Sequence, residues 1–489
     1  MEILIPLLLP LITAALIQLL GRFTTPNIRD GVHTLMAAVT FYFVLQLVDP
    51  VMSGERPDFF VAEMFPGLTL SFSVEPLGLM FALVASGLWI PTSVYAFGYM
   101  RGHHEANQTR FFTCFALAIG FALGVAFSEN LLTLFCYYEA LTFSTYPLVT
   151  HHQDAEGRRA GRIYMGILVT TSVCLLLTGI ASVYVLTGNM TFTQGGVFQA
   201  SGETFETWQI SLLLALFAFG TAKAALFPFH KWLPNAMVAP TPVSALLHAV
   251  AVVKAGVFTV LKVVIYIFGL EFLSELGAND WLMFVAGFTV LFSSTVALFK
   301  DNLKARLAYS TISQLAYIVL GASFATQTAA IGASMHIVMH AVGKITLFFC
   351  AGAIYVGAHK KYISQMDGLG RKMPFTMAAF TIASFSIIGV PPFGGMWSKW
   401  FLGLGALEGG SWVFMSIYMI SSLLSIGYLM PIVGRAYFRP LAEKDKDLHE
   451  APWMCVLPPV LTAIGCVVLF IFPEGLYELL QLMFVEVRP

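Results

Sequence analysis

Apolar segments of about 20 residues recur along the whole chain, and they limit its possible folds more than any other feature of the sequence. A helix of this length spans the hydrocarbon core of a bilayer and satisfies its backbone amides internally. The chain is 58% hydrophobic and only 11% charged, which leaves too little polar surface for several water-soluble domains. We therefore predict an all-α integral membrane protein.

The apolar segments predict about 14 transmembrane helices. The first segment lacks basic residues before its apolar core and a cleavage site after it, so we expect it to stay as a helix. No long tail follows the last segment, so neither a soluble catalytic domain nor an additional helix is expected. The segments lie near residues 2–20, 31–48, 77–99, 111–127, 130–149, 163–187, 207–228, 242–268, 281–299, 306–323, 328–356, 375–403, 412–434 and 453–472.

Lysine and arginine are divided unevenly between the loops on the two sides, and this division predicts the orientation in the membrane. Loops that follow odd-numbered segments hold 19 of the 26 basic residues, whereas the opposite side holds only Arg56 and Arg488. We therefore predict that both termini face outward. The 19 residues are Arg22, Arg29, Arg101, Arg110, Arg158, Arg159, Arg162, Lys231, Lys300, Lys304, Arg306, Lys360, Lys361, Arg371, Lys372, Arg435, Arg439, Lys444 and Lys446.

Charge and motifs argue against several classes of function. A formal net charge of -1 provides no basic excess for binding nucleic acid. The six cysteines lie singly in apolar stretches, without the spacing of a zinc site. The sequence has no dinucleotide-binding, P-loop, haem or iron–sulfur motif. We expect no nucleic-acid partner, no metal and no cofactor, so the energy for any transport must come from elsewhere.

Five lysines and one glutamate fall inside the apolar segments. A lysine at the centre of a bilayer costs about 2.5–3.5 kcal/mol on insertion scales, so a purely structural bundle would avoid these residues. Lys262 lies only a turn or two from the end of its segment, and we expect it to snorkel to an interface. The others are candidates for function. The set is Glu139, Lys223, Lys254, Lys262, Lys344 and Lys399.

Glu139 lies midway along its segment and requires a cationic partner. Lys223, midway along the seventh segment, is the best candidate at comparable depth. The alternative is a static ion pair that only fixes the packing. Desolvation usually makes buried ion pairs poorer stabilisers than apolar packing, which favours a functional pair.

Prolines and glycines interrupt two of the segments. Prolines in FPFHKWLPNAMVAPTP, beginning with Pro228, predict that the seventh segment breaks or ends there, because they lack an amide donor. Pro391, Pro392, Gly394 and Gly395 interrupt the twelfth segment shortly before its lysine. Broken helices at corresponding places in two halves are typical of transporters with inverted repeats, with a simple proline kink as the alternative for either break.

His336, His340 and Lys344 recur every four residues, so on a helix they form a stripe about 12 Å long and about 80° wide. Three titratable groups in register favour a proton relay over isolated core histidines. His248 and Lys254 point about 240° apart on a regular helix, so a proton could pass between them only through water or a distorted turn. HExxH and nearby carboxylates are absent, which argues against a metal at the histidines.

The segment TAKAALFPFHKWLPNAMVAPTPVSALLHAVAVVKAGVF closely resembles the signature of the proton-conducting antiporter-like family shared by respiratory complex I and Mrp antiporters. FCYYEALTFSTYPLV, DNLKARLAYSTISQLAYI, HIVMHAVGKITLFFCAGAI and GVPPFGGMWSKWFL support the resemblance, which covers roughly residues 70–440. It implies two inverted five-helix repeats, each with a broken helix. The implied divisions are 1–110 for helices 1–3, 111–268 for the first repeat, 269–440 for the second, and 441–489 for helix 14.

The resemblance also implies roles for individual residues. Glu139 pairs with Lys223, Lys254 relays the proton, and Lys399 ends the second half of the path. A lysine at position 399 is similar to the Mrp D type and to the largest complex I antiporter-like subunits, whereas some complex I members have glutamate. The absence of a lateral C-terminal helix and the length favour the D type. The implied site residues are Glu139, Lys223, His248, Lys254, His336, His340, Lys344 and Lys399.

The implied function is that of the proton-translocating subunit of a multisubunit Mrp-type sodium/proton antiporter in the inner (plasma) membrane of a bacterium. Its partners are other membrane subunits and the lipid bilayer, and the transported ions are protons, with sodium as a second candidate. Such a chain is part of a transporter and is not an enzyme. The alternative is a proton-pumping membrane subunit of a complex I-like NADH dehydrogenase or a membrane-bound hydrogenase. A self-sufficient solute carrier and a quinone-reducing enzyme are weaker alternatives, because no specificity pocket or redox centre is indicated.

Overall fold

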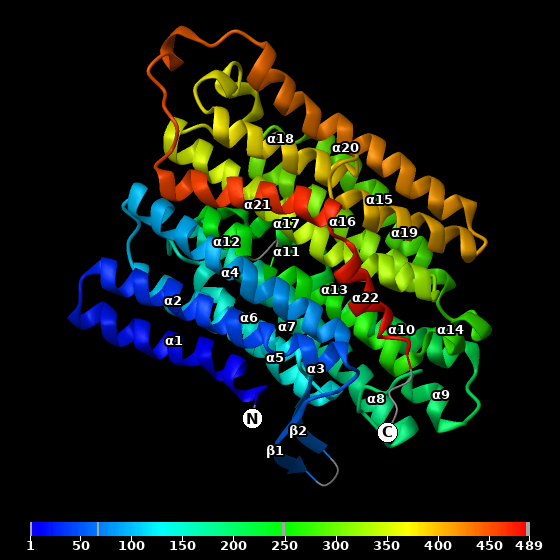
Figure 1. The fold of residues 1–489 in the computed structure, drawn as a ribbon. Coiled ribbons are helices and arrows are strands. Elements are labelled where there is room, and N and C mark those ends of the chain that lie inside the picture. Colours follow the sequence, from blue (N-terminus) through cyan, green and yellow to red (C-terminus); the bar gives the residue numbers. More distant parts are fainter. Residues whose placement is uncertain (1, 66–67, 247–249, 486–489) are drawn as a thin grey trace.

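Long helices lying side by side form most of the protein in the computed structural model, which describes residues 2–65, 68–246 and 250–485 (Figure 1). Each of the fourteen predicted segments is mainly helical in these residues, and the all-α membrane fold is confirmed. Nine helices of the described residues are long and apolar enough to cross a membrane, or ten if one bent pair counts as a single crossing. The remaining segments are broken, short or polar, so fourteen crossings stay a prediction.

The N-terminal part combines helices with a β-hairpin. In the hairpin, Asp58 pairs with Ser73 and Phe65 pairs with Leu68 in antiparallel register. The backbone amide of Ser73 donates to the carbonyl of Phe127 at 2.8 Å, so the hairpin is attached to the chain that follows α5. The elements are α1 (Leu4–Phe23), α2 (Pro26–Leu45), α3 (Val48–Met52), β1 (Asp58–Phe65), β2 (Leu68–Ser73), α4 (Pro76–Gly102) and α5 (Gln108–Ala126).

The middle of the chain contains several short or interrupted helices. A π-helical turn joins α7 to α8, and a second one follows α13. The helices are α6 (Leu131–Val149), α7 (Ala155–Thr171), α8 (Leu177–Thr187), α9 (Val197–Ser201), α10 (Thr207–Gly220), α11 (Trp232–Asn235), α12 (Thr241–Ala245), α13 (Val252–Val263) and α14 (Leu270–Leu276).

The C-terminal part is built around one long central helix, α17. It is buried over most of its 32 residues and contacts α4, α16, α18, α19 and α21. The helices are α15 (Asp280–Phe299), α16 (Leu303–Ser323), α17 (Gln327–Ala358), α18 (Pro374–Ile388), α19 (Gly395–Glu408), α20 (Trp412–Phe438), α21 (Trp453–Ile471) and α22 (Glu474–Gln481).

Large apolar side chains cover much of the outer surface of the bundle, as expected for helices in contact with lipid. Phe299 and Val185 are each 81% exposed, and Leu423 is 66% exposed. A water-soluble protein rarely exposes apolar residues on this scale. The chain is therefore a multi-pass membrane protein.

The helix interruptions differ from the sequence prediction in two places. The seventh segment ends at Gly220, well before Pro228, and continues as a 3-10 turn. The indole of Trp232 donates to the carbonyl of Ala222 at 2.9 Å, so a side chain satisfies one carbonyl at this break. The eighth segment, predicted as continuous over 242–268, is interrupted between α12 and α13. Tertiary contacts, and not prolines alone, set these breaks.

The interruption of the twelfth segment is confirmed. Helix α18 ends at Ile388 and α19 begins at Gly395, with both prolines between them. Gly389 has a φ of 90°, a left-handed conformation that strains any residue with a Cβ atom. The glycine therefore allows the chain to leave α18 and turn toward α19.

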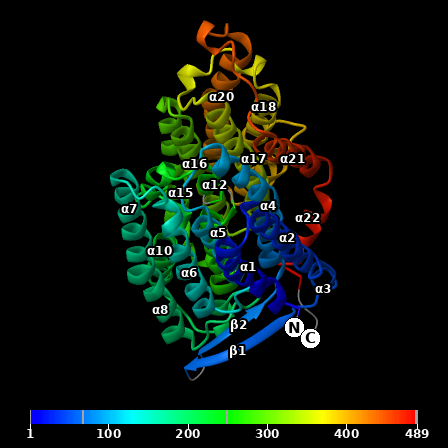
Figure 2. The ribbon, with the colours of Figure 1, turned by 90° about the vertical axis from the view of Figure 1, so that its left-hand side faces the viewer.

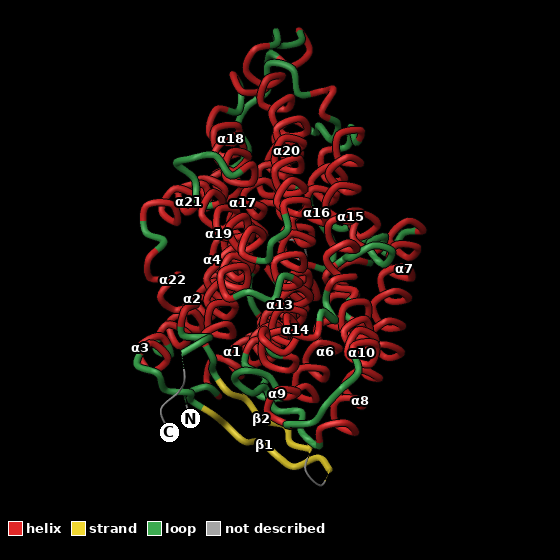
Figure 3. Tube along the Cα trace, turned by 90° about the vertical axis from the view of Figure 1, so that its right-hand side faces the viewer, coloured by secondary structure: helices red, strands yellow, loops and turns green. Residues whose placement is uncertain are grey.

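The start of α1, the end of α22 and the β-hairpin lie at the same end of the bundle (Figures 1 and 2). Figure 3 shows the same arrangement from the other side, with both strands close to the two termini. The shared location agrees with the prediction that both termini face one side of the membrane. The assignment of that side as the outer one rests on the loop charges alone.

Cysteine labelling tests the orientation. Glu203→Cys and Glu275→Cys should react with an impermeant maleimide added to intact cells, because these loops are predicted to face outward. Arg158→Cys and Lys372→Cys should react only after the membrane is opened. The exposed native Cys174 is first replaced by serine to remove its background signal. Labelling of position 158 from outside in intact cells would overturn the orientation.

Candidate functional site

Lys223 lies inside the break that follows α10, in the turn Ala222–Ala224, and its side chain is fully buried. Its ammonium donates to the carbonyl of Tyr138 at 2.7 Å and to the hydroxyl of Thr142 at 2.6 Å. The same nitrogen lies 3.1 Å from the centroid of the Tyr138 ring. Two oxygen acceptors and an aromatic face of α6 thus stabilise this buried cation.

Glu139 follows Tyr138 on α6, but it does not form a direct ion pair with the lysine. Among the described residues, its two carboxylate oxygens are buried and have no hydrogen-bond partner. Lys223 instead bonds to the residues on either side of the carboxylate, at positions 138 and 142. The predicted pair is therefore close in space and separated by one layer of α6 contacts.

Gly256 allows the break around Lys223 to pack closely against α13. A Cβ atom at this position would collide with the backbone of Lys223 and Ala224. The missing side chain brings the break and the first turns of α13 together. This packing sets the position of Lys254, which lies two residues earlier on the same helix.

Lys254 and His340 form the direct contact at the centre of the site. The ammonium nitrogen of Lys254 lies 2.7 Å from Nδ1 of His340, and both side chains are buried. Lys254 is on the first turn of α13, after the interruption that separates it from α12. His248, the other predicted residue of this segment, lies outside the described residues. The structure thus joins the first group of lysines to the histidine stripe.

The predicted stripe on α17 leads from His340 to His336. Their ring centroids are 5.9 Å apart, and Nδ1 of His336 lies 2.9 Å from the hydroxyl oxygen of Ser398. Within the part of the chain that the structure describes, Nε2 of each histidine is buried without a hydrogen-bond partner. Each ring therefore has one nitrogen engaged and one nitrogen available to a water molecule.

Lys399 marks the end of this row at the second helix break. Its ammonium donates to the carbonyl of Ile388 and to the hydroxyl of Ser422, each at 3.0 Å. The same nitrogen lies 5.1 Å from the centroid of Tyr317, whose ring stacks on His336 at 5.6 Å. Tyr317 therefore bridges the stripe and the last lysine, and the sequence analysis did not find it. Its position in YSTISQLAYI showed only an aromatic residue in an apolar segment.

Lys344 leaves the row and points toward α16. Its ammonium donates to the hydroxyl of Ser310 at 2.6 Å and to the carbonyl of Leu307 at 3.3 Å. The expected order from His340 through Lys344 to Lys399 is therefore not the order of the contacts. The contacts pass through His336 and Tyr317, and Lys344 forms a side branch.

Lys262 does not reach an interface, so the expectation of snorkelling is wrong. Its side chain is fully buried and forms an ion pair with Glu75 at 2.8 Å. The ammonium also donates to the carbonyl of Ser128 at 2.7 Å. All residues of α13 are buried, because this helix lies inside the bundle and has no face toward lipid. A position near the end of a segment predicts snorkelling only for a helix at the periphery.

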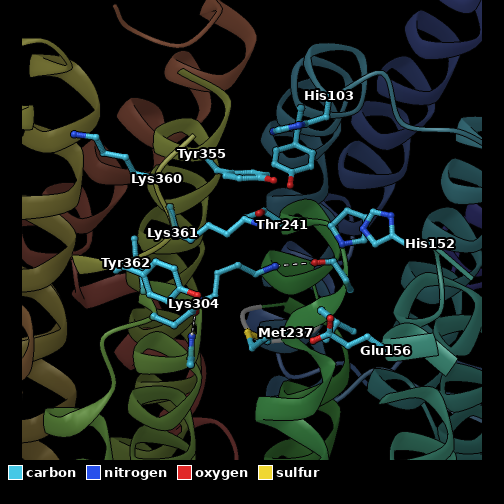
Figure 4. A pocket seen from close by; sticks show the side chains of 18 of the residues that line it. His103, His152, Glu156, Met237, Thr241, Lys304, Tyr355, Lys360, Lys361 and Tyr362 are labelled. Carbon is cyan, nitrogen blue, oxygen red and sulfur yellow. Dashed lines mark hydrogen bonds between the residues drawn. The ribbon is translucent and has the colours of Figure 1, made fainter. Parts of the chain in front are cut away.

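A polar cavity of about 520 Å³ opens at the end of the bundle that carries the basic loops (Figure 4). We call it the basic-end cavity, and its walls include His103, Glu105, Thr241 and Lys304. The ammonium of Lys304 donates to the carbonyl of Ala239 at 2.7 Å. The His103 ring stacks on the Tyr355 ring at 4.5 Å, as Figure 4 shows beside the cavity.

The loop residues around this cavity have altered proton affinities. Burial raises the pKa of Glu105, although the nearby His152 opposes that shift. Burial, together with His359 and Lys361, lowers the pKa of His103. Burial also lowers the pKa of His151 to about 4. The cavity therefore combines a carboxyl group that protonates more readily with histidines that stay neutral.

Comparison with known proteins identifies relatives over nearly the whole chain. Residues 128–425 match a family model described as NADH:quinone oxidoreductase/Mrp antiporter, TM. The chain is 30% identical to NADH-quinone oxidoreductase subunit N of Desulforudis audaxviator, over 96% of this chain and 95% of that protein. It is 29% identical to a Na(+)/H(+) antiporter subunit of Alkalihalophilus pseudofirmus, over 95% of this chain but only 60% of that longer protein.

Two solved structures have the same fold. A chain of the Mrp complex from Dietzia sp. DQ12-45-1b is 19% identical, with a TM-score of 0.85 over 99% of this chain and 97% of that one. A chain of the membrane-bound sulfane sulfur reductase, an archaeal respiratory membrane complex, is 24% identical, with a TM-score of 0.87 over 99% of this chain and 98% of that one. These likenesses concern the fold alone.

The packing at Gly256 generates a stability prediction. Gly256→Ala should lower the apparent melting temperature of the purified protein, because the new methyl group collides with the backbone of the break. Overpacking of this kind costs about 1–3 kcal/mol. Gly166→Ala is the matched control, since a Cβ atom there meets no atom within 4 Å and alanine favours a helix. The amount of monodisperse protein after heating measures both, and equal melting temperatures for Gly256→Ala and wild type would contradict the prediction.

Proposed function

The chain belongs to the NADH:quinone oxidoreductase/Mrp antiporter transmembrane family, and we propose that it is the proton-translocating subunit of a multisubunit cation/proton antiporter of the Mrp type. The observation that carries the proposal is the contact between Lys254 and His340, which joins two groups of buried titratable residues into one row. A static bundle has no need for a row of this kind, because each buried ammonium is costly.

The first step concerns Glu139 and Lys223. A carboxylate close to a buried ammonium stabilises its charge, and the ammonium is left uncompensated when the carboxylate moves away. The oxygens of Glu139 have no partner to hold them among the described residues, so small movements of α6 change this interaction. We propose that such movements make Lys223 load and release a proton.

The next steps follow the contacts along the middle of the protein. The proton released by Lys223 reaches Lys254 through water, with His248 as a participant on the interrupted part of the eighth segment. Lys254 passes it directly to His340, since the two nitrogens are in contact. From there it moves past His336 and its neighbour Tyr317 to the second break. The partnerless Nε2 atoms favour water molecules as the carriers between the rings.

Lys399 ends the row, and Lys344 modulates it from the side. Both lysines lie in the second half of the chain, as Glu139 and Lys223 lie in the first. We propose that residues 111–268 and 269–440 are the two inverted repeats, between helices 1–3 and helix 14. In support, each contains a helix broken near a functional lysine.

The basic-end cavity is the proposed proton entrance. It lies at the end of the bundle that the loop charges assign to the cytoplasm. Thr241, on its wall, begins α12, which leads toward the interruption before Lys254. Glu105 provides a protonatable group at its mouth, because burial raises the pKa of this carboxyl group.

A second candidate function is that of a proton-pumping membrane subunit in a complex I-like or hydrogenase-like redox complex. The observation in its favour is the match to the NADH-quinone oxidoreductase relative over 95% of that protein, whereas the antiporter relative is matched over 60%. Lysine at position 399 favours the antiporter, because some complex I members have glutamate there. The same relay serves either complex, and sodium is a second candidate ion in the antiporter alone.

Substitutions at the first pair separate a relay from a static pair. Glu139→Gln, Lys223→Ala and Lys399→Ala should each leave the complex assembled and remove most of the pH gradient that it forms in inverted vesicles. Glu139→Gln/Lys223→Ala should stay inactive, because no group remains that loads and releases the proton. Fluorescence quenching of a pH-sensitive dye measures the gradient, and blotting normalises it to the assembled complex.

The static alternative predicts the opposite pattern for these variants. Leaving one buried charge unpaired should destabilise the protein by about 3–5 kcal/mol, and removal of both charges should restore assembly and transport together. Recovery of transport in the double variant would therefore refute the relay. The proposed function would also fail if all three single variants kept wild-type transport.

The chain should also require partner subunits for activity. It carries no recognisable site for harvesting redox or chemical energy, and its structural relatives come from multisubunit complexes. Purification should retain further hydrophobic subunits, which mass spectrometry identifies. The isolated chain in liposomes should exchange protons for sodium much more slowly than the native membrane. Equal rates for the two would contradict this expectation.

A further inference from the structure

Helix α13 carries a second buried lysine that the proposed relay does not use. Lys262 follows Lys254 by eight residues, so the two lie about 12 Å apart along the helix axis and about 80° apart around it. The Lys262 ammonium is held by Glu75 at 2.8 Å, by the carbonyl of Ser128 at 2.7 Å, and by the ring of Phe192 at 4.5 Å. This cation is therefore placed on the same element as the central lysine of the relay.

The Lys262–Glu75 pair lines a cavity of about 210 Å³ at the end of the bundle that carries the β-hairpin. We call it the hairpin-end cavity. Its other charged or titratable lining groups are Arg56, Glu129 and Tyr266. The hydroxyl of Tyr266 is buried and forms no hydrogen bond within the described residues, so the cavity wall has a polar position for water. The cavity thus brings solvent to a buried, titratable ion pair.

An aromatic layer separates this pair from Lys254. Phe258 lies between the two lysines on α13, and its ring packs against Phe81 of α4 at 4.9 Å. The Lys262 ammonium is 5.5 Å from the centroid of Phe258. The hydroxyl of Thr259, the nearby polar side chain, is bonded to the carbonyl of Ala255 on its own helix. The layer is dry, and it prevents continuous proton leakage between the cavity and the relay.

We propose that Lys262 and Glu75 form a proton-exchange pair through which Lys254 communicates with the medium at the hairpin end of the membrane. This inference rests on the proposed function and adds to it a second connection, at the end opposite the basic-end cavity. The ammonium of Lys262 passes one proton to Glu75, and the resulting carboxylic acid releases it to water in the cavity. The neutral amine then takes a proton from the Lys254 ammonium when water enters the Phe81–Phe258 layer. One proton enters and one leaves in each cycle, so the charge of the pair is restored.

A static pair that only attaches α4 to α13 is the competing explanation, and arginine distinguishes the two. Lys262→Arg keeps a positive charge for Glu75, but a guanidinium does not release its proton in proteins. The variant should assemble normally and lose transport by more than about tenfold, as expected for an obligatory proton-transfer group. Wild-type transport in assembled Lys262→Arg would overturn the proposal. If that variant does not assemble, the neutral double variant Glu75→Gln/Lys262→Met replaces it, with the same two outcomes.

A second buried lysine–carboxylate pair provides the matched control. Lys360 and Asp445 are 2.6 Å apart with side chains 8% and 11% exposed, compared with 0% and 12% for Lys262 and Glu75. In Figure 4 the Lys360 side chain points away from the other labelled groups of the basic-end cavity. Lys360→Met/Asp445→Asn should therefore keep wild-type transport once it is normalised to assembled complex. An equal loss in both double variants would show a general effect of removing ion pairs and would overturn the proposal.

The unmodified complex provides a test that does not depend on folding of a variant. A water-soluble carbodiimide added from the hairpin side should activate Glu75, and the adjacent amine of Lys262 should displace the activated group to form an amide. Mass spectrometry quantifies the joined peptides, and transport should fall in parallel with their amount. No reaction at Glu75, or full transport after complete joining, would overturn the proposal. Loss of transport in Glu139→Gln with full transport in Lys262→Arg would leave the proposed function intact and remove only this inference.

Discussion

The cost of holding ammonium groups away from water is the constraint on which the rest of this structure depends. Each buried lysine of the site is stabilised by oxygen atoms of the backbone or of hydroxyl side chains. Lys399 donates to the carbonyl of Ile388, the last residue of α18, and Lys262 donates to the carbonyl of Ser128, just after α5. Carbonyls at helix C-termini lack an intrahelical partner and carry a partial negative charge. Ends and breaks of helices inside the bundle therefore supply the acceptors that intact helices cannot.

The same breaks explain why the functional groups form a row across the protein. A continuous helix would direct its side chains around its own axis, whereas a break allows the chain to present a lysine from a turn. Lys223 lies in such a turn, and Gly256 lets that turn contact α13. The unbroken α17 then carries the histidines past both halves of the chain. Rigid α17 and the two interrupted regions together hold the titratable groups at distances that one or two water molecules span.

The two polar cavities lie at opposite ends of the bundle, and the row of titratable groups lies between them. The basic-end cavity is lined by loop residues and the start of α12, and the hairpin-end cavity is lined by the Lys262–Glu75 pair. An aromatic layer at Phe258 separates the second cavity from the row. A transporter needs such a barrier, because an open aqueous path would dissipate the gradient. Control of proton movement would then depend on small changes at charged pairs and on brief wetting of dry layers.

Much of the architecture and many members of the site follow from the sequence alone. Apolar segments determine the helices, because the lipid interior allows few other backbone structures. Buried charges in those segments identify Glu139 and the lysines, because insertion of a charge without a purpose is costly. The four-residue spacing of His336, His340 and Lys344 determines their common helix, since the helical repeat is local. Family resemblance assigned the roles, which local physics alone did not.

The tertiary structure decided which of these groups meet. It placed Lys254 against His340, brought Tyr317 between His336 and Lys399, and turned Lys344 aside. It also buried Lys262 against Glu75, although the position of that lysine in its segment predicted an interface. Such contacts join residues far apart in the chain, and they depend on helix packing and on breaks such as the one after Gly220, where no proline stands. Periodicity and composition report on a single helix and its surroundings, so they contain no information on which faces of two helices come together.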